Sequence, residues 1–380
     1  MWAGVAGRPL SAKKLLFFAT EDWFVRSHFL PLLRRAHADG FEVVVAARDS
    51  RALAAESGVR VIDTPFARGS MQPRQLSRQI AHLRELLARE RPDVVHAIAL
   101  KPMALLALSE YRDAGLVFAL TGRGYFGVRR WFWQQAVSEW LRSVLRRALR
   151  QTRAALLVEN AADRDWLSAR GDLDEDTLIM PGAGVDPSVY VQAPQPPAPI
   201  VVGVVARLIW TKGVDVLVDA VQLLCARGEH IVLRIAGAAD AESPEAVPAR
   251  QIEQWRGLDR VEVLGGVRDV SAFWAGAHIA CLPSRGGEGL PRSLLEAAAC
   301  GRPIVTTDAP GCRDFVTAEM GLVVPRNDVH ALAEALRLLA GDASLRAAMG
   351  AAGRAKVIAG YTEAHAADVA SRAWARVIAQ

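Results

Sequence analysis

The feature that most constrains the fold is a repeated alternation of short apolar segments with longer segments of helical periodicity. Lys14–Thr20, Phe41–Ala47 and Asp93–Ile98 are short, mainly apolar runs, typical of strands that are buried on both faces. Between the first two lies His28–Asp39, where apolar residues recur at helical spacing and Gly40 follows as a stop signal. Strands that alternate with helices in this way predict a parallel, doubly wound α/β sheet.

The alternation is interrupted once, by a segment with five prolines within residues 186–199. Proline fixes φ and donates no backbone hydrogen bond, so this segment predicts a linker. The alternation restarts at Ile200–Val205 and continues along the second half of the chain. Because 380 residues exceed one ordinary hydrophobic core, we expect two α/β domains, residues 1–185 and 186–362. A C-terminal helix within 363–380 is expected to pack back on the first domain.

Composition narrows the classes of protein to which the chain can belong. Apolar residues make up 51% and charged residues 23%, a balance typical of globular proteins. The four cysteines lack CxxC spacing, and nothing else indicates a metal or cofactor, so we expect neither. The same cysteine pattern favours a reducing location for the protein. No apolar run reaches the roughly 18–20 residues of a spanning helix, and no signal peptide is expected. The net charge of +5 suits anionic partners such as phosphates.

The most informative segment is 283–316, which begins with a glycine-rich loop after an expected strand. Glycines there let the backbone approach a ligand closely. Pro291 suits the first position of the helix that follows, whose free amides and dipole form a site for a phosphate. Glu288 lies just before that helix, and Glu296 lies eight positions later. Two carboxylates that bracket an anion site make sense if the phosphates carry a sugar on each side, one of them a ribose.

This segment resembles the E-x7-E signature of the retaining GT-B glycosyltransferases of family 4, here Glu288 and Glu296 within EGLPRSLLE. The resemblance implies an α/β fold of GT-B type, in which two Rossmann-like, doubly wound parallel-sheet domains face a cleft. It implies that Glu288 orients the donor sugar, that Glu296 accepts from the ribose, and that the backbone near Gly289 and Leu290 meets the phosphates. The alternative interpretation is a surface loop followed by an amphipathic helix with a solvated glutamate.

A second segment, GVVARLIWTKG at 203–213, resembles the family pattern of a strand, then G-x-x-x-R-L, then K-G. The resemblance assigns Arg207 and Lys212 to the donor diphosphate, whose charge grows as it leaves, so we expect them to be catalytic together with Glu288. Taken singly, an arginine or a lysine in a loop is usually solvated. Three further positions implied to bind the donor are Gly203, Val267 and Arg268.

The first half of the chain resembles the family more loosely, because many relatives have a glycine-rich loop after the first strand and this chain does not. Two strings, VVHAIALKP and FALTGRGYFG, resemble a bacterial subgroup that acts on polyprenyl-diphosphate-linked sugars. The acceptor contacts that we expect are His96, Lys101, Thr121, Gly122 and His28. A histidine that ends a parallel strand could bond a sugar hydroxyl, and Lys101 could meet an acceptor phosphate. A lone histidine is, however, more often structural.

Residues 128–153 form another informative segment, with seven arginines and one glutamate. The apolar residues expected on one helical face are Trp133, Val137, Trp140, Val144 and Ala148. A basic amphipathic helix with tryptophans fits an element that lies in a membrane surface. The alternative is a core helix with a solvated basic face. No recognition motif for nucleic acid accompanies this charge, so no nucleic-acid partner is expected.

Together with these features, the resemblance implies a retaining, metal-independent glycosyltransferase. It would move a sugar, an N-acetylhexosamine or a hexose, from a UDP-sugar to a polyprenyl-diphosphate-linked saccharide during surface-glycan biosynthesis. We expect it to be cytoplasmic and peripheral on the inner face of the cell membrane. Closure of the cleft would exclude water, and the resemblance implies that an oxygen of the departing phosphate takes the acceptor proton. The alternatives are a GT-B sugar-nucleotide epimerase, which needs no acceptor, and a peripheral membrane-binding module with a degenerate cleft.

Overall fold

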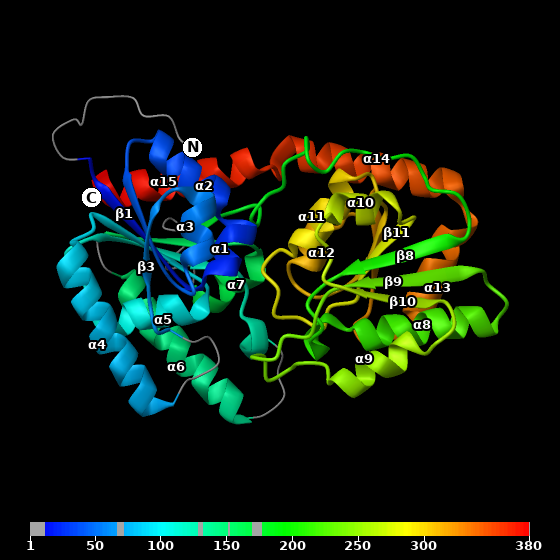
Figure 1. The fold of residues 1–380 in the computed structure, drawn as a ribbon, viewed down its shortest axis with the longest axis horizontal. Helices are drawn as coiled ribbons and strands as arrows, with labels where there is room; N and C mark the ends of the chain where they lie inside the picture. The colour runs from blue at the N-terminus through cyan, green and yellow to red at the C-terminus, as the bar shows by residue number, and fades with distance from the viewer. Residues whose placement is uncertain (1–11, 67–71, 128–131, 151–152, 169–176, 380) are drawn as a thin grey trace. The chain divides into compact units, whose positions relative to one another are not determined.

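The computed structural model describes residues 12–66, 72–127, 132–150, 153–168 and 177–379. The chain divides into two compact units, one formed by residues 1–183 with 363–380 and the other by residues 184–362. We call them the N-terminal unit and the C-terminal unit and describe each by itself (Figure 1). The division falls two residues before the boundary proposed after residue 185, and the last helix groups with the N-terminal unit.

The N-terminal unit is built on a seven-stranded parallel sheet with the order β3-β2-β1-β4-β5-β6-β7. Its strands are β1 (Lys14–Glu21), β2 (Glu42–Arg48), β3 (Arg60–Asp63), β4 (Val94–Ile98), β5 (Gly115–Leu120), β6 (Ala154–Val158) and β7 (Thr177–Ile179). The chain builds outward from β1 in one direction and from β4 in the other, so the strand order reverses between β1 and β4. Open α/β sheets bind ligands outside the carboxyl ends of the strands at such a reversal.

Helices cover both faces of this sheet, and each face has its own hydrophobic core. The helical elements are α1 (Asp22–His28), α2 (Leu30–Ala38), α3 (Arg51–Ser57), α4 (Pro73–Glu90), α5 (Leu100–Ser109), η1 (Gly124–Gly127), α6 (Phe132–Leu149), α7 (Ala161–Leu167) and α15 (Glu363–Ala379). The last of these buries Trp374 completely. A Cβ at Gly115 would lie 2.6 Å from the Val377 side chain, so this glycine lets α15 approach β5 closely.

Two details of the N-terminal unit differ from the predicted elements. The helix expected at 28–39 is α2, which begins at Leu30, and a further helix that was not predicted, α1, precedes it and ends at His28. Pro31 lies in the first turn of α2, where its missing N–H costs nothing and favours a new helix start. Strands β3 and β7 were not predicted; they are the edge strands, and their half-exposed residues give only a weak apolar signal.

The C-terminal unit is built on a six-stranded parallel sheet with the order β10-β9-β8-β11-β12-β13. Its strands are β8 (Ile200–Val205), β9 (Ile231–Ala236), β10 (Val261–Gly265), β11 (Ile279–Leu282), β12 (Ile304–Thr307) and β13 (Gly321–Val324). The strand order of this sheet reverses between β8 and β11. The second predicted α/β sheet is therefore present, and it has the same kind of reversal as the first.

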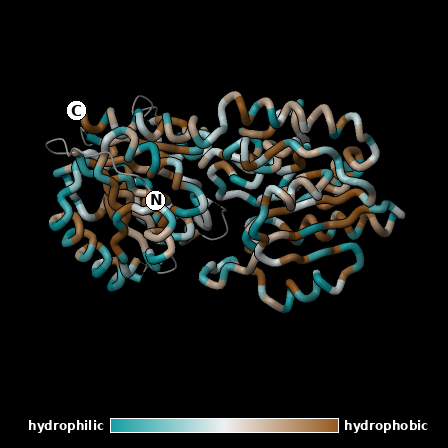
Figure 2. Tube along the Cα trace, turned by 45° about the horizontal axis from the view of Figure 1, so that its top comes forward, coloured by the Kyte–Doolittle hydropathy of each residue, from teal (hydrophilic) through white to brown (hydrophobic). Residues whose placement is uncertain are grey.

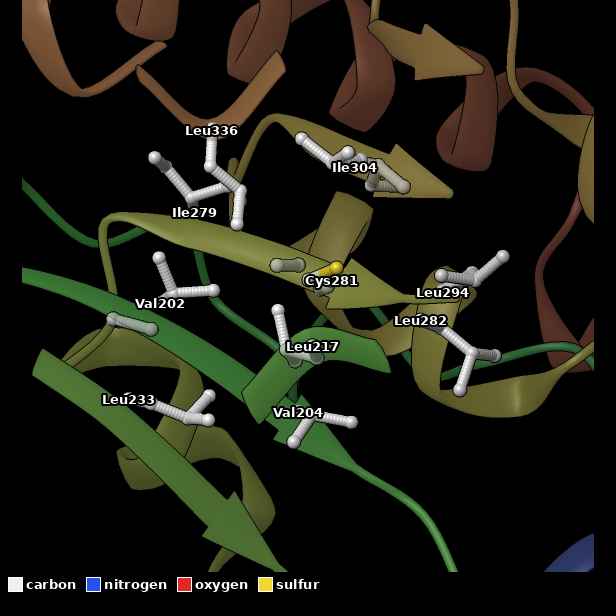
Figure 3. Packing of buried hydrophobic residues seen from close by; sticks show 14 of the residues in the cluster. Val202, Val204, Leu217, Leu233, Ile279, Cys281, Leu282, Leu294, Ile304 and Leu336 are labelled. Atoms are coloured by element: carbon white, nitrogen blue, oxygen red, sulfur yellow. The ribbon is translucent and has the colours of Figure 1, made fainter. Parts of the chain in front are cut away.

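One continuous core stabilises the C-terminal unit. Its helical elements are η2 (Trp210–Lys212), α8 (Val214–Ala226), α9 (Ala249–Arg256), α10 (Val270–Ala275), α11 (Arg292–Ala299), α12 (Cys312–Phe315), α13 (Val329–Gly341) and α14 (Ala343–Gly360). Figure 3 shows part of this core, in which Val202 and Val204 of β8 pack with Leu217 of α8. In both units the hydrophobic residues concentrate along the strands, while polar residues follow the outer helices (Figure 2). Burial of these apolar strands drives the formation of both sheets.

Candidate active site

The strand-order reversal of the C-terminal unit gathers the two segments that the sequence assigned to the donor diphosphate. After β8 the chain passes Arg207 and ends η2 at Lys212, and after β11 it forms the loop 283–290. Gly213 explains how these segments meet, because its φ is +70° and a Cβ there would lie 2.0 Å from the carbonyl oxygen of Pro283. Only glycine permits this approach, which gives the K-G motif a structural reason.

Lys212 and Glu288, both predicted to be catalytic, bond directly to each other. The Lys212 Nζ donates to Glu288 Oε1 at 2.7 Å and to Oε2 at 2.8 Å, and the Ser284 hydroxyl donates to Oε1 at 3.1 Å. The side chains of Lys212 and Glu288 are 14% and 13% exposed, so solvent reaches the pair only in part. At such a pair a diphosphate can compete for the ammonium group while sugar hydroxyls compete for the carboxylate.

Arg285 is a residue of this site that the sequence analysis missed. Its guanidinium donates to both carboxylate oxygens of Asp215, in the first turn of α8, at 2.8 and 2.6 Å. Its Nε donates to Asn327 Oδ1 at 2.6 Å, and its backbone N–H donates to the Thr211 carbonyl at 2.8 Å. Arg285 therefore ties the loop that carries Glu288 to the short helix that carries Lys212. An isolated arginine beside glycines gives no sequence signal of such partners.

Glu296 lies two turns along α11 and is largely buried, with 7% of its surface exposed. The Tyr190 hydroxyl donates to its Oε1 at 3.0 Å, and Arg292 Nε lies 3.1 Å from the same oxygen. Burial raises the pKa of Glu296 above its ordinary value, and the charge of Arg292 opposes that shift. Tyr190 was not predicted because it belongs to the segment interpreted only as a linker. Pro291 caps α11 instead of beginning it, a difference of one residue.

Arg207 lies at the carboxyl end of β8 and is paired with Asp240, which follows β9. The Arg207 side chain is 44% exposed, and that of Asp240 is 12% exposed. The two predicted cations thus share one feature: each lies against a carboxylate in this structure, Lys212 against Glu288 and Arg207 against Asp240. Asp240 had no motif to mark it, so sequence reasoning did not find it.

The other predicted donor-binding residues have different surroundings. A Cβ at Gly203 would lie 3.0 Å from the Phe273 ring and 3.1 Å from the Ala277 side chain, so this glycine lets α10 pack on β8. The structure thus gives this glycine a packing role, and its expected contact with the donor stays a prediction. Leu290 is buried, and Gly289 is approached so closely that a Cβ on Gly311 would lie 1.6 Å from its carbonyl oxygen. Half-buried Val267 and exposed Arg268 lie beyond β10, an edge strand of the sheet.

Three predicted acceptor residues lie at the carboxyl edge of the sheet of the N-terminal unit. Lys101 is in the first turn of α5, directly after β4, and Thr121 and Gly122 follow β5. Lys101 is half-buried, and burial lowers its pKa to about 8; the charge of Arg48 lowers it further and that of Glu21 opposes the shift. The loop after Gly122 is held by Arg123, whose Nε donates to the buried Asp163 carboxylate at 2.9 Å.

The two predicted acceptor histidines differ in accessibility. His96 is completely buried: its Nδ1 accepts from the Trp374 indole at 3.0 Å, and its ring stacks on Phe17 at 5.1 Å. Burial lowers the pKa of His96 to about 3, so the ring is neutral. The whole His96 ring is enclosed in the core between Phe17 and Trp374, and we leave His96 out of the acceptor site. His28 ends α1 with its ring half-buried, 2.6 Å from the Ser27 hydroxyl.

Helix α6 covers most of the basic segment; residues 128–131 and 151–152 and the side chain of Trp133 lie outside the described part. Its apolar residues divide between two faces, contrary to the single face expected. One face is buried in the core and consists of Leu141, Leu145, Ala148 and Leu149. The other exposes Phe132 by 82% and Trp140 by 42%. Among the described residues, no helix combines the length and apolarity needed to cross a membrane.

Comparison with known proteins agrees with this arrangement. Residues 25–206 match Glycosyltransferase Family 4, and residues 199–342 match Glycosyl transferases group 1. A "GDP-mannose-dependent monoacylated alpha-(1-6)-phosphatidylinositol monomannoside mannosyltransferase" from Corynebacterium glutamicum is 38% identical over 165 residues, 41% of this chain and 42% of that protein. An "N,N'-diacetylbacillosaminyl-diphospho-undecaprenol alpha-1,3-N-acetylgalactosaminyltransferase" from Campylobacter jejuni is 24% identical over 306 residues, 76% of this chain and 78% of that protein.

Among solved structures, Anabaena Alr3699/HepE in complex with UDP-glucose superposes with a TM-score of 0.75 at 17% identity, covering 94% of this chain and 98% of that one. The chain spans less than half the length of the curated relatives that it matches at 37% and 38% identity. The two family matches follow each other along the chain, and the two parallel sheets are those of the GT-B fold. The chain therefore belongs to family 4 of the glycosyltransferases, a family of retaining hexosyltransferases with the GT-B fold.

Proposed function

We propose that this chain transfers an N-acetylhexosamine or a hexose from a UDP-sugar to a polyprenyl-diphosphate-linked saccharide, in the biosynthesis of a surface glycan. The observation that carries the proposal is the Lys212–Glu288 pair at the strand-order reversal of the C-terminal unit. It supplies a cation for a departing diphosphate and a carboxylate for a sugar, both on backbone fixed by Gly213 and Arg285.

On the donor side, the two cations exchange partners when the donor binds. The diphosphate draws the Lys212 ammonium and the Arg207 guanidinium from the carboxylates that hold them in this structure. Glu288 then accepts from hydroxyls of the donor sugar, and Glu296 accepts from the ribose. The fixed cations neutralise the charge that develops on the leaving group, which is work that a metal ion does elsewhere. The acceptor hydroxyl attacks from the face that the diphosphate leaves, and a phosphate oxygen takes its proton.

Two relatives support different donor nucleotides. UDP-glucose occupies the Anabaena protein of the same fold, whereas the Corynebacterium relative is described as GDP-mannose-dependent. The Campylobacter relative transfers N-acetylgalactosamine to a diphospho-undecaprenol-linked sugar, as its name states. It matches a larger share of this chain than the Corynebacterium relative does. We therefore propose a UDP-sugar and a lipid-linked acceptor, with a GDP-sugar as the rival donor.

Helix α6 supports peripheral attachment to the inner face of the cell membrane, where a lipid-linked acceptor would be found. Its exposed residues include Phe132, Trp140 and Arg147, and exposed Arg150 follows directly after the helix. Aromatic rings enter the interface of a bilayer, and arginines attract anionic headgroups. A double variant, Phe132→Ser with Trp140→Ser, is expected to sediment less with vesicles containing anionic lipid. Its control is Ile179→Ser with Val189→Ser, exposed apolar residues outside α6. Equal sedimentation of both variants and wild type would remove this part of the proposal.

The test of the proposed reaction is a transfer assay in EDTA with a panel of UDP- and GDP-sugars, with and without prenyl-diphosphate-linked saccharides. The proposal predicts a glycosylated lipid product that requires both substrates and survives EDTA. Interconversion of sugar nucleotides without an acceptor would instead indicate an epimerase. Absence of both hydrolysis and transfer with every donor would contradict the proposal.

A further inference from the structure

Three charged side chains lie together at the strand-order reversal of the N-terminal unit. Glu21 is the last residue of β1, Arg48 is the last residue of β2, and Lys101 lies in the first turn of α5, directly after β4. The register pairs Glu21 with Arg48 across the two strands. The charges of Glu21 and Arg48 both shift the pKa of Lys101, Glu21 upward and Arg48 downward, so the three groups lie near one another. This edge is where a doubly wound sheet binds its ligand.

Glu21 is the unusual member of this group because its two carboxylate oxygens have different surroundings. Arg48 donates to Oε2 from Nη2 at 2.9 Å and from Nε at 3.3 Å. The other oxygen, Oε1, is buried and has no hydrogen-bond partner among the residues that the structure describes. Although Glu21 is the N-cap residue of α1, its side chain makes no capping hydrogen bond. The residue as a whole is only 5% exposed.

A buried carboxylate oxygen without a donor is an energetic penalty that folded proteins rarely leave uncompensated. Arg48 compensates Oε2 and fixes the orientation of the carboxylate, so the position of Oε1 is fixed as well. A ligand that brings a hydrogen-bond donor to Oε1 removes the penalty when it binds. Because the penalty is present in the empty site and absent from the occupied one, binding of a ligand with hydroxyl groups is favoured.

The backbone beside this group supports a binding role. Ala99, between β4 and α5, has φ of +73° and ψ of +162°, a region that glycine occupies and alanine avoids. Its N–H donates to the Ala119 carbonyl at 2.9 Å, and its carbonyl accepts from the Met103 N–H at 3.1 Å, which hold it in that conformation. Strained residues of this kind occur at ligand-binding sites, where the surrounding structure fixes them. Here the strained residue sets the start of the helix that carries Lys101.

We propose that Glu21 Oε1 accepts a hydrogen bond from one hydroxyl of the acceptor saccharide, with Arg48 holding the carboxylate in place. Glu21 is then a specificity residue for the acceptor, and this inference rests on the proposed function. A phosphate in the same position would set negative charge against the Glu21 carboxylate, whereas a hydroxyl donates to it. The ligand of Oε1 is therefore the sugar, and Lys101 is left for the phosphate.

The test compares Glu21→Ala and Glu21→Gln with wild type in the full-length chain. The probes are prenyl-diphosphate-linked N-acetylglucosamine and its monodeoxy analogues, or the same series on whichever prenyl-diphosphate saccharide is the best acceptor. We expect Glu21→Ala to raise the acceptor KM about 10- to 100-fold, the usual effect of losing a hydrogen bond to a charged group. The donor KM and the acceptor-independent hydrolysis of the donor should stay unchanged, because both depend on the C-terminal unit.

The deoxy analogues separate recognition from structural damage. One analogue lacks the hydroxyl that meets Glu21. With wild type, its KM should exceed that of the parent acceptor by the same factor as the Glu21→Ala substitution causes. With Glu21→Ala, its KM should equal that of the parent acceptor. The matched control is Glu90→Gln, another buried carboxylate of the N-terminal unit, bonded to Arg60 and located before β4 at the opposite edge of the sheet. It is expected to lower the melting temperature without changing the acceptor KM.

The outcomes distinguish this inference from the function on which it rests. An acceptor KM within twofold of wild type in folded Glu21→Ala, or equal losses for all deoxy analogues in wild type and variant, overturns the role of Glu21 alone. If Glu21→Ala does not fold, Glu21→Gln and the deoxy series on wild type give the same comparison. Absence of hydrolysis and transfer in wild type with every sugar nucleotide overturns the proposed function, and the inference with it.

Discussion

The carboxyl edges of the two sheets make an instructive comparison. In the C-terminal unit, two residues predicted from motifs, Lys212 and Glu288, bond to each other in the structure. In the N-terminal unit, one predicted histidine, His96, is part of the core, and the charged group at the edge includes two residues that no motif marked, Glu21 and Arg48. Both edges occupy a strand-order reversal. The topology therefore predicts a ligand-binding edge in each unit, while the motifs predict the chemistry of only one.

The largest expected effect is that of removing the ammonium group at the donor edge. Lys212→Ala should lower kcat by about 10²–10³-fold, or ~3–4 kcal/mol, because the leaving diphosphate loses a preorganised charge partner. The measurement is steady-state transfer at saturating donor and acceptor. Lys356→Ala is the control, since this half-buried lysine of the same unit bonds only to a backbone carbonyl, that of Phe315, among its described hydrogen bonds. Near-normal turnover of Lys212→Ala would break the assignment of the donor edge.

The next effect concerns the side chain that positions Lys212. Arg285→Ala should reduce kcat by roughly 10- to 100-fold, because the loop loses its side-chain bonds to the backbone of η2 and to α8, and small misplacements are costly in catalysis. Arg285→Lys should recover little, since a lysine cannot reproduce the two-point contact with Asp215. Arg234→Ala removes a surface pair with Glu262 in the same unit and serves as the control. If Arg285→Ala and the control Arg234→Ala lose the same small amount of activity, Arg285 has only a structural role.

The smallest effect tests whether His96 belongs to the core. Its pKa is lowered to about 3 in the folded protein, below the ordinary value of 6.5, so at pH 5 the unfolded chain binds a proton that the folded chain does not. The free energy of unfolding should therefore fall as the pH drops below 6.5, by about 1.4 kcal/mol per pH unit from this residue, and the contribution ends near pH 3.

Urea unfolding of wild type and His96→Phe between pH 7 and pH 5 measures this slope. The variant removes the titrating group and keeps a ring to stack on Phe17, so its stability should depend less on pH than that of wild type. Other histidines contribute equally to both proteins, and the difference between the two slopes isolates His96. Equal slopes would show that His96 titrates normally and is accessible to solvent, which would restore it as a candidate acceptor contact.

The sequence predicted the two α/β sheets well, for physical reasons, and its motifs marked two residues that the structure brings together at one sheet edge. Runs such as Phe41–Ala47 and Ile200–Val205 are mainly apolar because both faces of a parallel sheet are covered by helices. Sequences with this fold therefore carry such runs. Lys212 and Glu288 were marked by the K-G and E-x7-E motifs, and the first of these motifs reflects a backbone requirement. Gly213, for example, admits no side chain where it meets Pro283.

The remainder depends on contacts between residues far apart in the sequence. His96 was interpreted as a residue that meets the acceptor at the end of its strand, but its side chain lies in the core, where the Trp374 indole from the C-terminal helix donates to it. Glu21 and Arg48 meet only because β1 and β2 pair in one register, which no local pattern reveals. Tyr190 reaches Glu296 from a segment whose prolines predicted only irregular backbone. Such pairings are set by tertiary packing, and each became visible only with the sheet assembled.

The most direct test of the account is calorimetric titration of the full-length chain with UDP and with the UDP-sugar that it uses. The account predicts that wild type binds the nucleotide sugar, that Lys212→Ala loses most of this affinity, and that Glu21→Ala binds as tightly as wild type. This result would place donor recognition at the edge formed by β8 and β11 and leave Glu21 to the acceptor. Unchanged affinity in Lys212→Ala, or equal losses in both variants, would contradict the division of roles between the two units.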